Sequence, residues 1–142
     1  MIEKHERNLD LLAANAANDI VDAQARTAER AKALDNVATK ALGVFQENGV
    51  YAGVLFLLST SQDSDIAHHI AGALTDLTGQ LGYSKWQVPA RTPQAMLPYY
   101  SQTVCVQLDR LLLVKGLFEQ TLVYVRYGAK ARQREKKAEE TS

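Results

Sequence analysis

The sequence is poor in cysteine and histidine, with one cysteine and three histidines in 142 residues. With Cys105 alone, an internal disulfide is excluded, and a zinc site built from thiolates lacks a second sulfur ligand. The valines on either side of Cys105 favour a buried structural thiol over a nucleophile. Three histidines leave little material for an acid–base site.

Long apolar runs are also absent. The longest, residues 50–58, is far shorter than the ~20 residues that a transmembrane helix needs. The first residues, 1–7, are charged and lack the apolar core of a signal peptide. We therefore expect a cytoplasmic protein with no membrane partner.

The chain has no net charge, because 16 basic residues balance 16 acidic ones. A neutral chain is not a histone-like polycation, so any contact with nucleic acid would need a local basic patch. The length suits one domain with a real core, and 46% hydrophobic with 23% charged residues is ordinary for a globular protein.

Motifs of known catalytic sites are missing: there is no glycine-rich phosphate loop, no Gly-x-Ser-x-Gly elbow and no repeated carboxylate pair. Only Asp63, Asp65, His68 and His69 resemble a metal site. Asp65 and His69 are four apart and would share a helix face, but adjacent histidines point about 100° apart and further ligands are lacking. We predict no catalytic residue, no metal and no cofactor. A small enzyme centred on Asp65, His68 and His69 is the remaining alternative.

Apolar residues keep a helical phase from position 9 to position 45, with no glycine or proline before Gly43. The pattern predicts either one helix of about forty residues or two nearly collinear helices with a joint around 27–31. Gly49 would end this region. The apolar segment 50–58 is expected to be a helix at the bundle centre or under another subunit, with a strand as the alternative.

The rest of the chain repeats the 3.6-residue period. It predicts a helix over 66–81 and, after a kink or restart at Pro98, a helix with two apolar faces over 108–129. The fold class predicted is all-α, a single-domain bundle of about five or six helices over residues 1–131. The charged residues 132–142 are expected to form a disordered tail.

The segment 83–93 breaks the helical pattern and holds the only tryptophan. Trp86 there is either a hydrophobic plug or, with Lys85 and Arg91, part of a loop that stacks on a base or anchors a partner.

Basic residues gather near the C-terminal end, where positions 115–137 hold seven of them against two acidic ones. On a helix, Lys115, Arg126, Lys130 and Lys137 fall within roughly 60° of one another. A stripe of cations can follow a line of phosphates, and the bland alternative is a solvated helix face. The predicted RNA-backbone contacts are Lys115, Arg126, Lys130, Arg132, Arg134 and Lys137.

Two segments together resemble a known family. Residues 41–57 read Ala-Leu-Gly-Val-Phe-Gln-Glu-Asn-Gly-Val-Tyr-Ala-Gly-Val-Leu-Phe-Leu, and residues 122–131 read Leu-Val-Tyr-Val-Arg-Tyr-Gly-Ala-Lys-Ala. Their order resembles the small all-helical subunit of the type III-B CRISPR effector, the fifth subunit of the Cmr complex. The chain departs from the family pattern in lacking a proline before Asn48 and in having Ser59–Thr60 where a basic residue is usual. Arg126 and Lys130 remain as the matched basic positions.

The resemblance implies a non-catalytic protein of antiviral defence that is present in several copies and stacks along an RNA-guided ribonucleoprotein complex. Its partners would be the other effector subunits, the guide and target RNA, and further copies of itself, and RNA cutting would belong to neighbouring subunits. The alternative is a helical protein–protein adaptor or homo-oligomeric bundle without nucleic acid.

Overall fold

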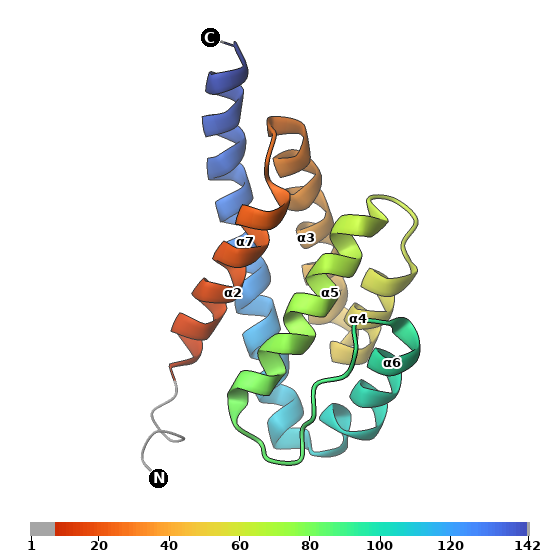
Figure 1. Cartoon of the computed structure of the whole chain (residues 1–142). Coiled ribbons are helices and arrows are strands. Elements are labelled where there is room, and N and C mark those ends of the chain that lie inside the picture. The colour runs from red at the N-terminus through yellow and green to blue at the C-terminus, as the bar shows by residue number, and fades with distance from the viewer. Residues whose placement is uncertain (1–7, 142) are drawn as a thin grey trace.

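The computed structural model describes residues 8–141, which form six α-helices, two short 3-10 helices and no strand (Figure 1). The α-helices are α2 (Leu9–Gln24), α3 (Ala28–Asn48), α4 (Val50–Ser59), α5 (Ser64–Thr78), α6 (Pro93–Gln102) and α7 (Leu108–Thr141). The 3-10 helices are η1 (Gly79–Leu81) and η2 (Val104–Val106). The predicted all-α bundle is confirmed. The prediction made from the charged residues 1–7 lies outside the described residues.

The first apolar pattern folds as two helices, α2 and α3, separated by residues 25–27. Thr27 is the N-cap of α3, and its hydroxyl accepts a hydrogen bond from the Arg30 N–H at 3.1 Å. The single-helix and collinear alternatives are both wrong, because the chain reverses direction between the two helices (Figure 1). Ala25 is the C-cap of α2 and Thr27 the N-cap of α3, so the direction changes over three residues without any glycine or proline.

The long helix α7 packs against both α2 and α3. The residues that it buries against them lie on the predicted apolar face and beside it: Val114, Leu117, Phe118, Thr121, Leu122, Val125 and Ala129. The Phe118 ring meets Phe45 of α3 edge-on at 5.6 Å and Tyr100 of α6 at 6.3 Å. These aromatic contacts join α3, α6 and α7 within a core to which all six helices contribute buried residues.

The segment 50–58 forms the helix α4, so the strand alternative is wrong. Val54 and Leu57 are buried against the neighbouring helices, whereas Tyr51 and Leu55 are exposed. The helix therefore lies at the side of the bundle, next to α3, α5 and α6, rather than at its centre (Figure 1).

The C-terminal residues differ from the prediction of a disordered tail, since α7 stays helical to Thr141. Arg132 reaches Asp22 of α2 at 2.7 Å, and Glu140 accepts the Ala28 N–H at 2.9 Å. Lys136 and Glu139, one turn apart, are 3.6 Å from each other. These polar contacts replace the apolar packing that the tail sequence lacks.

Pro98 lies inside α6 without ending it. The break before α7 comes later, at η2, where Thr103 and Gln107 leave helical geometry. None of the helices within residues 8–141 is both long and apolar enough to span a membrane.

Candidate functional site

Two of the predicted RNA contacts, Arg126 and Lys130, share one carboxylate inside the protein. Asp35 of α3 lies 3.7 Å from Arg126 Nε and 3.5 Å from Lys130 Nζ, and its side chain is only 15% exposed. The Arg126 Nε atom is buried and has no hydrogen-bond partner, so this contact is electrostatic rather than a formed hydrogen bond. Both cations therefore tie α7 to α3 in the isolated chain.

Lys115 and Arg132 are also engaged within the chain. Lys115 Nζ is 2.5 Å from Glu119 on the next turn of α7. Arg132 contacts Asp22 of α2 at 2.7 Å and Glu135 at 3.6 Å. The predicted stripe is thus not a row of unpaired cations.

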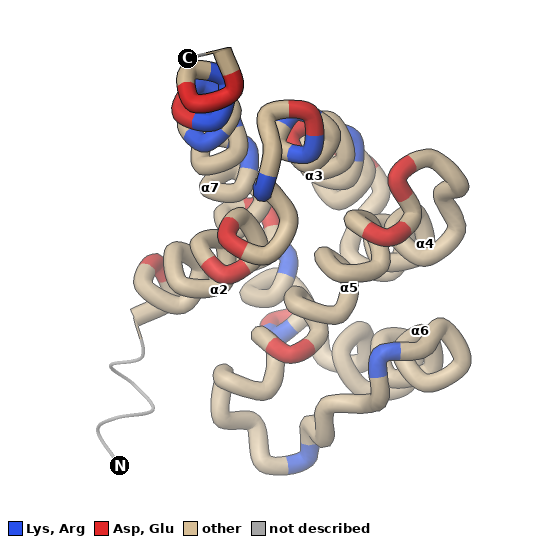
Figure 2. Tube along the Cα trace, turned by 45° about the horizontal axis from the view of Figure 1, so that its top comes forward, with Lys and Arg blue, Asp and Glu red and all other residues tan. Residues whose placement is uncertain are grey.

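The outer face of α7 carries the cations that the bundle leaves accessible. Arg134 and Lys137 are exposed, and neither forms an ion pair with any other residue in 8–141. Lys130 is half-exposed, and Tyr127 beside it is 65% exposed. Lys130, Arg134 and Lys137 follow Tyr127 by three, seven and ten residues, so the four side chains lie on one side of the helix. We call Tyr127, Lys130, Arg134 and Lys137 the outer strip; Figure 2 shows the charged residues gathered at this end of α7.

The structure does not bring Lys85, Trp86 and Arg91 together. Trp86 is buried, with its ring 4.7 Å from Tyr83 and 6.4 Å from Tyr99, so it is the hydrophobic plug and not a free stacking surface. Lys85 is exposed and lies near η2.

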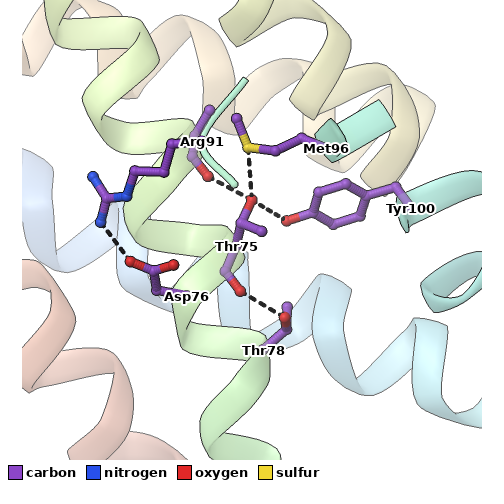
Figure 3. A network of polar contacts seen from close by, with 7 residues as sticks. Thr75, Asp76, Thr78, Arg91, Met96 and Tyr100 are labelled. Carbon is purple, nitrogen blue, oxygen red and sulfur yellow. Dashed lines mark hydrogen bonds and ion pairs between the residues drawn. The ribbon is translucent and has the colours of Figure 1, made fainter. Parts of the chain in front are cut away.

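Arg91 lies across α5. A Cβ atom placed on Gly72 would be 2.6 Å from its Cδ, so only glycine leaves room for the Arg91 side chain here. The guanidinium ends on Asp76, 2.6 Å away (Figure 3). Arg91 thereby fastens the segment before α6 to α5.

The side chains of Asp65 and His68, which the sequence placed in one candidate metal site, contact different parts of the chain. Asp65 accepts a hydrogen bond from Arg30 at 2.8 Å, which lowers the pKa of its carboxyl group. His68 Nε2 lies 3.3 Å from the Leu58 carbonyl oxygen. No three histidine, cysteine or carboxylate side chains within the described residues are placed to hold a metal ion.

His69 lines a shallow cleft of about 290 Å³ between α2 and α5. Burial lowers the pKa of its imidazole, and the nearby Arg91 cation adds to the effect. The carboxylates of Asp19 and Asp76 line the same cleft. The Asp76 carboxylate in this cleft is paired with Arg91.

A buried polar network joins α5 to α6, and the sequence analysis missed it. Thr75 and Tyr100 place their hydroxyl oxygens 2.9 Å apart, and those of Thr78 and Tyr99 are 2.6 Å apart (Figure 3 shows the first pair). Burial raises the pKa of both tyrosines, so they stay protonated as hydrogen-bonding groups. The sequence did indicate this network, because Thr75 and Thr78 lie three residues apart on an otherwise apolar face of α5.

Cys105 in η2 is half-buried, and burial raises the pKa of its thiol, which disfavours the thiolate form.

Comparisons of the chain with protein-family models, with curated proteins and with solved structures found no match.

Proposed function

We propose that this protein is a non-catalytic small subunit of an RNA-guided, type III-B CRISPR effector complex. It contacts the guide–target RNA backbone through the outer strip of α7. The observation that carries the proposal is the exposure of Arg134 and Lys137, which form no ion pair within residues 8–141, on the same side of α7 as the half-exposed Lys130. The resemblance of residues 41–57 and 122–131 to that family supplies the choice of complex.

The spacing of the outer strip suits a phosphate backbone. From Lys130 to Lys137 the helix rises about 10 Å, which spans roughly two phosphate steps along one strand. Lysine and arginine contacts to phosphate position a duplex without reading its bases. Three cations bind weakly alone, but several copies in line would gain from avidity.

The test is affinity purification of the tagged protein from its native host, with mass spectrometry of partners and sequencing of bound RNA. We expect large effector subunits together with RNA of guide length. In a variant carrying Lys130→Glu, Arg134→Glu and Lys137→Glu, we expect the subunits to be recovered with less RNA. RNA retention that does not change between 50 and 200 mM salt would count against phosphate contacts.

A matched control reverses three exposed cations elsewhere, with Lys32→Glu, Lys40→Glu and Lys85→Glu. This variant has the same net charge as the outer-strip variant. Equal loss of RNA in both would mean that net charge and not the outer strip governs retention.

The second candidate function is a protein–protein adaptor without nucleic acid. It is favoured by the large apolar side chains exposed at the start of α7 and on α2 and α4. Recovery of one protein partner without RNA would place this function first.

A further inference from the structure

A groove runs between the first turn of α2 and the first half of α7. Its volume is about 500 Å³, and its lining residues are Leu9, Asp10, Leu112, Leu113, Gly116, Leu117 and Gln120. Leucines thus form most of its wall, although it lies on the surface of the bundle.

Apolar surface continues beyond the groove. Leu112 in the lining is 57% exposed, and on the same two helices Leu108 is 68% and Leu11 54% exposed. Single exposed leucines are ordinary on protein surfaces, but a group of them around an apolar groove is typical of an interaction site.

Among the described residues, the charges at this groove are negative. Asp10, whose carboxylate accepts a hydrogen bond from the Tyr124 hydroxyl, is the only charged residue among the described residues of the lining. Asp109 lies on the same side of α7 as Gly116 and Gln120. The two cations of this part of α7 are occupied elsewhere: Arg110 lies over the Tyr83 ring at 4.1 Å, and Lys115 pairs with Glu119. An acidic rim repels RNA and favours a protein segment with basic residues.

Gly116 leaves the middle of the groove open. A Cβ atom added there would meet nothing within 4 Å. The missing side chain lets another helix approach α7 closely, in the way that ridges of one helix enter the grooves of another. From Leu112 to Gln120 the groove extends about 12 Å, which matches roughly two helical turns.

We propose that this groove docks an amphipathic helix of a partner protein. That helix presents apolar side chains at i, i+4 and i+7 to the leucines and places a lysine or arginine against Asp10. The recognition combines apolar burial with charge pairing, as in other helix-in-groove complexes. It does not depend on RNA binding, because no residue of the outer strip lines the groove.

The experiment uses two synthetic alanine-rich helical peptides of about 18 residues, a length at which such helices form. Both carry leucines at i, i+4 and i+7, and they differ in flanking lysines or flanking glutamates. Binding to the full chain is measured by amide chemical-shift changes in nuclear magnetic resonance spectra. We expect changes centred on Leu112, Gly116 and Gln120, and a Kd for the lysine peptide at least about tenfold lower than for the glutamate peptide.

Gly116→Trp places a bulky side chain in the groove, from a position where an added Cβ meets nothing within 4 Å, and we expect it to weaken binding of the lysine peptide at least about tenfold. Gly43→Trp on α3 is the matched control, since a Cβ there also meets nothing within 4 Å. Asp10→Asn should reduce the preference for lysine over glutamate.

Equal binding of both peptides, or equal weakening by both tryptophan variants, would overturn the proposal. A dimer in sedimentation that Gly116→Trp abolishes would overturn it in favour of a second copy of the chain as the occupant. Much tighter peptide binding by a chain lacking residues 2–7 would overturn it in favour of that segment.

Discussion

The ring of Phe45 fills the space beside Gly53 in which a side chain would begin. A Cβ atom on Gly53 would lie 2.3 Å from Phe45 Cδ1, far inside van der Waals contact. Phe45 is fully buried and meets Phe118 edge-on, so its ring has no room to move away. This contact sets how closely α4 approaches α3.

Gly53→Ala should destabilise the protein by about 1–3 kcal/mol, because the added methyl group overpacks the core against Phe45. The free energy of unfolding in urea measures the loss. Gly43→Ala is the matched control: its Cβ meets nothing within 4 Å, and the higher helix propensity of alanine should stabilise α3 by about 0.5–1 kcal/mol. Equal effects of the two substitutions would contradict the overpacking argument.

Asp35→Asn should release Arg126 and Lys130 from their shared carboxylate. We expect a loss of about 1–3 kcal/mol in unfolding free energy, because Asp35 is largely buried and the buried Arg126 Nε has no other partner. RNA retention in the complex should rise and become more sensitive to salt, since Arg126 becomes available to phosphate and Lys130 loses the carboxylate that competes for it.

Glu47→Gln serves as the control for Asp35→Asn. Glu47 is an exposed residue on the same helix that makes no ion pair with another residue of the described chain. If both variants retain RNA equally, Asp35 does not restrain the two cations.

Thr75→Val should cost about 1–3 kcal/mol, because it leaves the fully buried Tyr100 hydroxyl without its partner. Tyr100→Phe should cost less, since Thr75 keeps its hydrogen bond to the Ala71 carbonyl at 2.7 Å. The double variant should lose less than the two single losses added together. Urea unfolding of all four proteins forms the cycle, and strict additivity would show that the hydroxyls do not interact.

His69 should make stability fall in mild acid. Its pKa in the folded protein lies below the ordinary value of 6.5, so the unfolded chain takes up the proton first as pH falls. Stability is therefore unaffected by this group above pH 6.5 and declines as pH drops from 6.5 through the folded pKa. Urea unfolding at pH 7.5 and pH 5.5 measures the decline, which His69→Gln should reduce. An imidazole that titrates at 6.5 or above in nuclear magnetic resonance spectra would refute this.

The helices were predictable because each depends on local pattern. The apolar period indicated helices that the structure contains, and Gly49 indicated where the second of them ends. The reversal between α2 and α3 was missed, since α2 ends at the Ala25 cap and α3 begins at the Thr27 cap while the apolar period continues across both.

For the candidate site, the sequence predicted which basic residues α7 carries but not which of them are paired. The basic residues of α7 were recognised from the sequence, but Asp35 and Asp22, which hold three of them, lie about a hundred residues away along the chain. Trp86 was left between two interpretations, and only the position of Tyr83 and Tyr99 around its ring decides for the plug. Such contacts join different segments of the chain, so the residue pattern within one segment does not predict them.

The sequence by itself determined the all-α class, the concentration of positive charge near the C-terminal end and the lack of familiar catalytic motifs, because these depend on nearest neighbours and composition. Tertiary structure alone decided which cations face solvent, the direction in which α3 leaves α2, and the groove at Gly116. Those features arise where residues that are distant in the chain come into contact. The strength of such contacts depends on burial and on the distance between side chains, and not on the order of residues in the sequence.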